Sequence, residues 1–283
     1  MHPLTRRDFL KVFTHLLTAT AAGSVYSVFF EPSWIEVTQV SLKLRRLPAA
    51  FSGFRLLQIA DMHFGGWMTL ERFRPALDLI HAQTPDAIVI PGDFIHGTWD
   101  SAFHVLEDVK GAFHALTERY PTFAVLGNHD HGIDADMVRS FLKDTGIREL
   151  RNDLWPIKKA GERLYLCGVD DIWNKQNDLT GIVAKLSAQD CAILLAHEPD
   201  FADTAAATGK FDLQLSGHSH GGQVVIPFMK KPPLLPWLGE KYHTGLYQVG
   251  EMLQYTTRGL GMVNPPVRFN CRPEITVLTL ESA

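Results

Sequence analysis

The stretch FRLLQIADMH, residues 54–63, joins a run of apolar residues directly to an aspartate and a histidine. A run this short and this continuously apolar is typical of a β-strand that is buried on both faces. The side chains of Asp61 and His63 then follow the carboxyl end of that strand. Ligands bind at this edge in open α/β sheets. The stretch therefore predicts both a class of fold and the position of a functional site.

The same design recurs along the chain, with each apolar run ending in a loop rich in Gly, Asp, Asn or His. Helical patterns with one apolar face separate the early runs, and strands that alternate with helices predict an α/β protein. The further runs are AIVIP (87–91), TFAVL (122–126), RLYLCGV (163–169), CAILLA (191–196) and LQLS (213–216). The helical faces comprise Leu70, Phe73, Leu77 and Ile80, then Trp99, Phe103, Leu106, Phe113 and Leu116, all interpreted as core.

The chain after residue 245 changes character. The segments LYQVG, MLQYTTRG and ITVLTL have strand composition and no long helix between them, which predicts a second, more antiparallel sheet there. Residues 224–245 contain four prolines and predict a long ordered loop. Its apolar residues either pack over the sheet or lie against lipid, with its lysines near phosphates. They are Phe228, Leu234, Leu235, Trp237 and Leu238, with Lys230, Lys231 and Lys241.

The overall composition excludes several classes of protein. Of the 283 residues, 46% are hydrophobic and 20% charged, as in an ordinary globular protein rather than a disordered one. The net charge of −4 gives no electrostatic case for binding nucleic acid. Cys167, Cys191 and Cys271 are too few and too scattered for a disulfide framework or a thiolate zinc site.

The N-terminus forms a separate unit. The sequence TRRDFLK, residues 5–11, precedes nineteen residues without a charged side chain and resembles a twin-arginine export signal. That resemblance implies the twin-arginine export machinery as a partner and a place in the membrane or cell envelope. Ala19-Thr20-Ala21 is a candidate cleavage site, and an uncleaved segment would act as a membrane anchor. We therefore expect a leader or anchor over residues 1–30 and one domain over residues 31–283.

The polar clusters at the strand ends together predict a metal site. Carboxylate, imidazole and amide ligands suit Mn, Fe or Zn, and seven such side chains are too many for one ion but suit two. Two neighbouring ions need an anionic bridge, and together they can deprotonate one water and hold the oxygens of a transferring phosphoryl group. The seven side chains belong to Asp61, His63, Asp93, Asn128, His197, His218 and His220. His81, His104 and His114 lie on the expected helices and are predicted to be solvated or capping residues.

The order DxH, GD, GNHD, H, GHxH, from about Phe54 to Leu280, resembles that of the calcineurin-like metallophosphoesterases. The resemblance implies a four-layered α/β sandwich of two mixed sheets flanked by helices. It also implies that Asp93 bridges the two ions and that His129 is a general acid, which protonates the leaving oxygen. The implied first ion is held by Asp61, His63, Asp93 and His220, and the second by Asp93, Asn128, His197 and His218.

One position departs from the family pattern. Many members carry an aspartate where this chain has His96, and that aspartate orients the histidine of GNH. An aspartate favours the protonated form of such a histidine, whereas a second histidine does not. We expect Asp130 or water to take over this task for His129, or the leaving group to be acidic enough to need little help.

The implied activity is hydrolysis of a phosphodiester or pyrophosphate by a hydroxide between two divalent ions. The leader, the stretch GHSHGGQV and the ending RFNCRPEITVLTL resemble a bacterial membrane-associated subgroup. Some of its members hydrolyse UDP-2,3-diacylglucosamine in lipid A synthesis, and others are general phosphodiesterases. Phosphomonoesterases and non-catalytic scaffolds of the same fold are the alternatives. Candidate substrate contacts are His96, Trp237 and Lys241.

Overall fold

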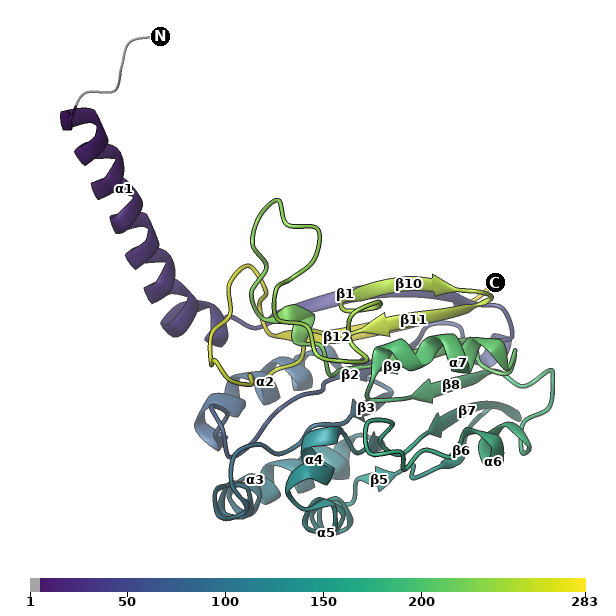
Figure 1. The fold of residues 1–283 in the computed structure, drawn as a ribbon. Helices are drawn as coiled ribbons and strands as arrows, with labels where there is room; N and C mark the ends of the chain where they lie inside the picture. Colours follow the sequence, from purple (N-terminus) through teal and green to yellow (C-terminus); the bar gives the residue numbers. More distant parts are fainter. Residues whose placement is uncertain (1–5) are drawn as a thin grey trace.

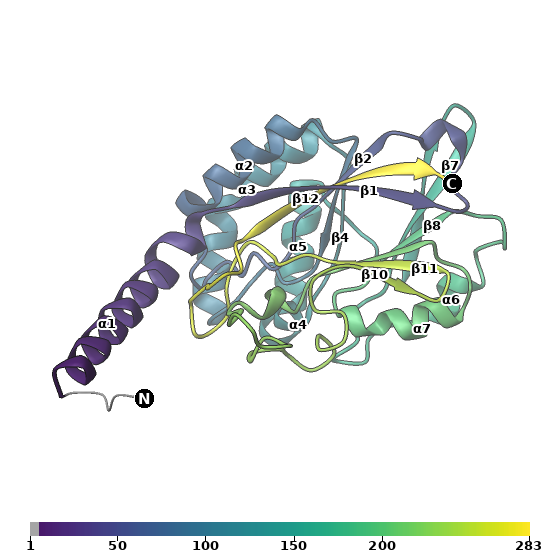
Figure 2. The same ribbon diagram turned by 90° about the horizontal axis from the view of Figure 1, so that it is seen from above.

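The computed structural model describes residues 6–283, apart from the side chains of Asp8, Phe9, Leu16 and Ala19. Two six-stranded sheets pack face to face, and helices cover both outer faces (Figures 1 and 2). The four-layered sandwich of two mixed sheets that the sequence predicts is therefore confirmed.

The first sheet has the strand order β1-β12-β2-β3-β4-β5. Strands β2 to β5 run parallel, while β12 pairs antiparallel with β2 and parallel with β1. The bounds are β1 Glu36–Leu44, β2 Phe54–Gln58, β3 Ala87–Pro91, β4 Thr122–Val125, β5 Arg148–Glu149 and β12 Glu274–Ser282. Its outer helices are α2 Leu70–Gln83, α3 Trp99–Arg119 and α5 Ala135–Thr145, and the short α4 Asn128–Ile133 follows β4.

The second sheet has the strand order β10-β11-β9-β8-β7-β6. Its central strands β7, β8 and β9 run parallel, and hairpins add an antiparallel strand at each edge. The bounds are β6 Asp153–Lys159, β7 Glu162–Gly168, β8 Ala192–Leu195, β9 Leu213–Ser216, β10 Gly245–Val249 and β11 Met252–Thr256. The helices α6 Leu179–Val183 and α7 Ala202–Ala207 cover its outer face.

Both faces of each central strand are buried, which explains the continuous apolar runs. Alternate residues of a strand point to opposite faces. In β2, Leu56 packs between the two sheets and Leu57 packs against the helices. In β8, Ile193 faces the other sheet and Leu194 faces the outer helices. The layer between the sheets therefore fixes how the strand ends of one sheet meet those of the other.

A polar contact ties the sheets together beside the strand ends. The side-chain amide of Gln58, at the end of β2, donates to the backbone carbonyl of Ser216, at the end of β9, at 2.9 Å. Both residues are buried. This bond holds the loops that follow β2 and β9, one from each sheet, next to each other.

Two expectations for the later chain and the core are wrong. Strand β12 does not join the second sheet but lies inside the first, between β1 and β2, because its partners are far away in sequence. Trp99 and Phe103 are 52% and 39% exposed. Their rings stack on each other, and the Trp99 indole donates to Asp134 at 2.9 Å, so this end of the apolar face lies at the solvent boundary. Phe73, Leu106, Phe113 and Leu116 are buried as expected.

The N-terminal helix α1, Arg6–Val25, projects away from the domain (Figures 1 and 2). A helical stretch from Leu10 to Ser33 is long and apolar enough to cross a membrane, and its most apolar window is not buried against the domain. This is consistent with a signal sequence or an anchor. Residues 1–5 of the expected leader, and the side chains of Phe9 and Ala19, lie outside the described part of the chain.

The packing between the sheets predicts where the fold is most sensitive. We expect Leu278→Ala to lower the free energy of unfolding by about 2–5 kcal/mol, because Leu278 of β12 is fully buried between the sheets. Leu246→Ala is the control, since Leu246 is 47% exposed in β10 and its loss is expected to cost within about 0.5 kcal/mol. Urea unfolding followed by circular dichroism measures both, and equal costs would contradict the assignment of β12 to the core.

Candidate metal centre

The carboxylate of Asp93 lies at the centre of the candidate site. Its Oδ2 is 3.1 Å from Nε2 of His197 and 3.5 Å from Nε2 of His63. Its Oδ1 accepts a hydrogen bond from the backbone N–H of His129 at 3.0 Å. Asp93, His63 and His197 are all buried. One carboxylate thus stands between imidazoles that follow strands of both sheets.

Six of the seven expected ligands form two compact groups around this carboxylate. In one, atoms of Asp61, His63 and His220 lie within 4.8 Å of one another; in the other, atoms of Asp93, His197 and His218 do so. The seventh, Asn128, places its Oδ1 at 3.2 Å from Nε2 of His197. The two histidines of GHSH therefore separate into different groups. Ser219 between them donates its hydroxyl to the carbonyl of His243.

The donor set of each group fits a divalent ion. Nε2 atoms of His63 and His220 face each other at 2.9 Å, and Oδ2 of Asp61 is buried without a hydrogen-bond partner. Lone pairs therefore converge where few protons are available to satisfy them. Carboxylate oxygens and neutral imidazole nitrogens are the ligands that Mn, Fe and Zn accept. The arrangement can hold two ions.

Burial controls the protonation of these imidazoles. It lowers the pKa of His63 and of His220, and it lowers the pKa of His218 to about 4. A low pKa keeps the ring neutral at neutral pH, and the neutral ring is the form that binds metal. His197 differs, because the Asp93 carboxylate raises its pKa well above the usual value although burial opposes this.

The backbone of the site is strained. Asp61, His63, Asp93, His218 and His220 all have φ between 52° and 71°, in the left-handed region. This conformation costs a residue with a side chain about 1–2 kcal/mol. Five such residues among seven expected ligands show that the loops are held in place by the surrounding packing rather than by local preference.

A glycine permits the tightest approach. A Cβ added at Gly217 would lie 2.7 Å from Oδ2 of Asp61, closer than a real Cβ approaches an oxygen. The backbone of the loop after β9 can therefore lie directly against the Asp61 carboxylate. The N–H of His218 uses this approach and donates to Oδ1 of Asp61 at 2.9 Å.

Comparison with known proteins places this site in a family. Residues 54–222 match the family model described as calcineurin-like phosphoesterase. The chain is 35% identical over 288 residues to the uncharacterized metallophosphoesterase YkuE of Bacillus subtilis. The matched region covers 100% of this chain and 99% of YkuE.

The chain belongs to the calcineurin-like phosphoesterase family.

Two further relatives are informative. The phosphodiesterase YaeI of Escherichia coli is 34% identical over 281 residues, covering 98% of this chain and 99% of YaeI. A transmembrane protein with metallophosphoesterase domain from Danio rerio is 27% identical over 280 residues, covering 94% of this chain and 62% of that protein. This chain is therefore a metal-dependent phosphoesterase with a candidate dinuclear centre.

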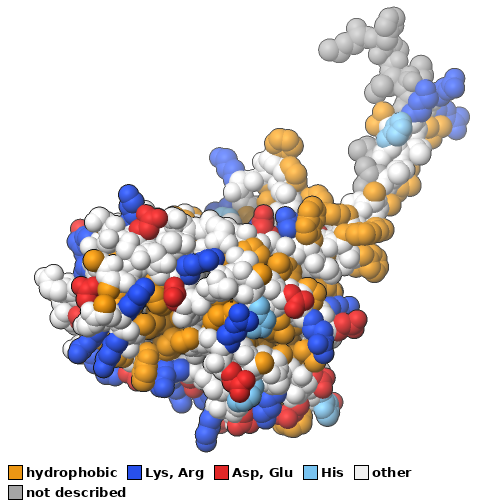
Figure 3. Space-filling view, turned by 180° about the vertical axis from the view of Figure 1, so that it is seen from behind, with side chains coloured by type: hydrophobic (Ala, Val, Ile, Leu, Met, Phe, Trp, Pro, Cys, Tyr) orange, Lys and Arg blue, Asp and Glu red, His pale blue; other side chains and the backbone are white. Residues whose placement is uncertain are grey.

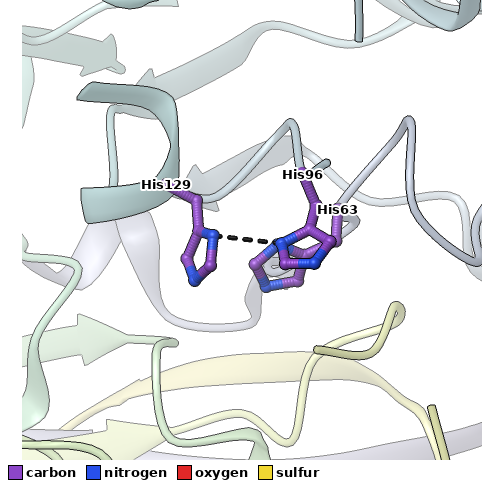
Figure 4. A group of neighbouring side chains, drawn as sticks. All are labelled: His63, His96 and His129. Carbon is purple, nitrogen blue, oxygen red and sulfur yellow. Dashed lines mark hydrogen bonds between the residues drawn. The ribbon is translucent and has the colours of Figure 1, made fainter. Parts of the chain in front are cut away.

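His129, the histidine of the GNH motif, faces His96, the position at which this chain departs from the family pattern. Nδ1 of His129 lies 3.1 Å from Nδ1 of His96, and the two rings point toward each other beside His63 (Figure 4). The three rings also form a third group of possible ligands. A hydrogen bond between the two Nδ1 atoms requires that one of them carries the proton.

Asp130 does not orient His129, contrary to one of the expectations. Its buried carboxylate accepts backbone N–H groups from Gly127 and from the loop after β3. It thereby joins the end of β4 to the loop that carries Asp93. The donors in that loop are the N–H groups of Asp93, Phe94 and Ile95, at 2.8–3.1 Å.

A cavity of about 370 Å³ opens from the centre and has an apolar wall. Trp173, which lies outside the motifs that predict the site, packs its ring against His218 and Trp237 with centroid distances of 5.6 and 5.2 Å. A signal for it exists, because Asp170-Asp171-Ile172-Trp173 follows β7 as the ligand clusters follow other strands. The cavity is lined by Asp93, Asn128, His129, Trp173, His218, Ser219, His220, Gln223, Leu234, Leu235, Pro236, Val263 and Asn264.

The three expected substrate contacts have different surroundings. His96 lies against His129. Trp237 is 56% exposed, and its backbone carbonyl lies 2.8 Å from Nε2 of His218. The structure does not bring Lys241 to the cavity, because its ammonium pairs with both oxygens of Asp203 at 2.7 Å.

The close approach at Gly217 can be tested directly. We expect Gly217→Ala to weaken Mn²⁺ binding about 10–100-fold, as the loss of an outer partner of a metal ligand does, because the added methyl displaces the Asp61 carboxylate. Gly111→Ala is the control, since nothing lies within 4 Å of a Cβ added there. Isothermal titration calorimetry gives both affinities, and wild-type affinity in Gly217→Ala would show that the contact does not position Asp61.

Proposed function

We propose that this enzyme hydrolyses phosphodiesters at a centre of two divalent metal ions bridged by Asp93. The placement of the Asp93 carboxylate between His63 and His197 carries the proposal. Asp61, His63, Asp93 and His220 would hold one ion, and Asp93, Asn128, His197 and His218 the other. Such a pair supplies a deprotonated water and neutralises charge on the phosphoryl oxygens.

The chain's own residues would handle the leaving group. His129 lines the cavity, and one of its two ring nitrogens is engaged by His96. If Nδ1 of His96 accepts, Nδ1 of His129 donates to it, and a His129 ring protonated on both nitrogens carries its second proton on Nε2. His129 can then give the Nε2 proton to the departing oxygen as a general acid and is left as a neutral ring. His96 would thus orient the His129 ring through a hydrogen bond, where an aspartate would also stabilise its positive charge.

The cavity favours a diester over a monoester. No Lys or Arg is among the residues that line it, so a phosphomonoester dianion would find no cationic side chain there. Leu234, Leu235, Pro236 and Val263 instead offer an apolar wall to a second substituent on the phosphate. The relative YaeI carries the name phosphodiesterase.

We further propose that the substituent is part of a lipid and that α1 is an uncleaved membrane anchor followed by a domain over residues 31–283. The apolar wall of the cavity and the exposed apolar helix support this. The first candidate substrate is UDP-2,3-diacylglucosamine, a pyrophosphate that carries a lipid substituent. UDP-2,3-diacylglucosamine is a cytosolic nucleotide lipid, so this candidate requires that the anchor hold the domain on the inner side of the membrane. If Arg6 and Arg7 instead direct twin-arginine export of the domain to the cell envelope, the substrate would be another lipid phosphodiester.

The bridging role of Asp93 predicts that its removal lowers metal binding and activity together. We expect Asp93→Ala to bind fewer than two Mn²⁺ per chain and to lose more than about 100-fold in kcat/KM, since even an outer partner of a ligand contributes about 10–100-fold. Metal analysis and hydrolysis of bis(p-nitrophenyl) phosphate measure the two effects. Asp203→Ala, whose carboxylate pairs with Lys241, is the control. Full activity of Asp93→Ala would exclude the mechanism.

The role of His129 predicts a dependence on the leaving group. General acid catalysis contributes about 10²–10⁴-fold, so His129→Ala is expected to slow hydrolysis of a diester with an alkyl leaving group by this amount. A p-nitrophenolate departs without protonation, and its release should slow far less. A second variant, His96→Phe, removes the ring nitrogen that contacts Nδ1 of His129. Both variants, His129→Ala and His96→Phe, should still bind Mn²⁺. Equal losses for the two leaving groups would assign His129 another role.

A substrate panel separates the alternatives. Metal-loaded enzyme is expected to hydrolyse UDP-2,3-diacylglucosamine and an aryl phosphodiester faster than an aryl phosphomonoester, as judged by kcat/KM. Preference for the monoester would favour a phosphomonoesterase. Hydrolysis of none of them by protein with both ions bound would favour a scaffold.

A further inference from the structure

Exposed apolar side chains gather on the face from which α1 leaves the domain. Ile226, Phe228 and Met229 form the tip of the loop after the GHSH motif, and Phe228 is fully exposed. Phe29 and Phe30, at the base of α1, are 71% and 62% exposed. Figure 3 shows hydrophobic side chains on the projecting loop and along the base of the helix. We call residues 226–229 the tip.

The tip and α1 are held by one segment of chain. Residues 268–271 bind the base of α1 on one side: the N–H of Arg268 donates to the carbonyl of Ser27 at 3.0 Å, and that of Asn270 to Glu31 at 2.9 Å. The same segment binds the start of the loop, because the N–H of Val225 donates to the carbonyl of Phe269 at 2.8 Å.

These contacts fix the direction in which both parts project. Glu31 is fully buried although it carries a carboxylate, and it also accepts the N–H of Cys271. The Cys271 thiol in turn donates to the carbonyl of His220 at 3.2 Å. The helix base, the tip and the metal-site loop are thus parts of one hydrogen-bonded unit. Figure 1 shows α1 and the loop leaving the same side of the domain.

We propose that the tip inserts into the surface of the bilayer that α1 spans, so that the catalytic cavity opens beside that surface. The inference rests on the anchor proposed above. A bilayer is the partner we propose for the tip, because a membrane that surrounds the apolar helix α1 can also cover an apolar tip beside it. Lys230 and Lys231 follow the tip directly and are exposed, which suits anionic lipid headgroups. Leu234 and Leu235 of the same loop line the cavity, so a lipid substrate would have a short path.

The three cysteines allow a direct test on the full chain. All three are buried, and burial raises the pKa of each thiol, so an added surface cysteine can be labelled selectively. The variants are Phe228→Cys at the tip, Leu17→Cys on α1 and Lys158→Cys on the exposed β6 edge. Each carries the environment-sensitive nitrobenzoxadiazole dye. Each is reconstituted into vesicles of phosphatidylethanolamine and phosphatidylglycerol.

The expected result is a blue-shifted emission at positions 17 and 228 and severalfold weaker quenching by aqueous iodide than at position 158. Quenching at 228 equal to that at 158, with 17 protected, would overturn the docking and leave the anchor. Exposure of both 17 and 228 would overturn the anchor as well. Protection of 228 in detergent that grows with protein concentration would assign the tip to a second copy of the chain and so overturn the proposal.

An activity measurement gives an independent check. Phe228→Asp lies outside the cavity lining, so hydrolysis of a soluble aryl diester should stay unchanged. Hydrolysis of a diester embedded in the same vesicles should fall severalfold. Equal rates of wild type and variant on the embedded diester would contradict the docking. If the wild type does not hydrolyse the soluble aryl diester at all, the proposed function is refuted instead.

Discussion

The constraint on which the structure depends is a buried carboxylate surrounded by imidazoles. Burial by itself raises the pKa of an aspartate, yet the neighbouring His197 holds the pKa of Asp93 well below its usual value. Asp93 therefore stays charged, and its partners cannot move away without leaving a buried charge unpaired. The buried charge of Asp93 and the packing around it thus hold the candidate metal ligands close together.

This constraint explains why the site needs both sheets. Asp61, His63, Asp93 and Asn128 follow strands of the first sheet, and His197, His218 and His220 follow strands of the second. The packed layer between the sheets and the bond from Gln58 to Ser216 set their separation. The left-handed backbone at five of these positions is the conformational cost of turning each loop sharply at the strand end.

Much of this arrangement could be predicted from the sequence, because its determinants are local. Each buried parallel strand is a continuous apolar run, and each ligand cluster follows its run within a few residues. Strand β12 could not be placed, since its position between β1 and β2 depends on pairing between residues more than 200 apart in sequence. The edge strand β1 is not predicted either, because its alternating residues lack a continuous apolar run.

The features that escaped prediction depend on three-dimensional contacts. Asp130 looked like a partner for His129, but its carboxylate is used by backbone N–H groups of another loop. Trp173 reaches the cavity only because β7 lies beside β8 in the sheet. The link from α1 through residues 268–271 to the GHSH loop joins parts more than 200 residues apart.

The central claim is that Asp93 bridges two ions. Crystals of the full chain grown with Mn²⁺ test it most directly, through anomalous difference density collected near the manganese edge. We expect two peaks, both contacting Asp93, one beside Asp61, His63 and His220 and the other beside Asn128, His197 and His218. A single peak, or two peaks of which only one contacts Asp93, would contradict the account.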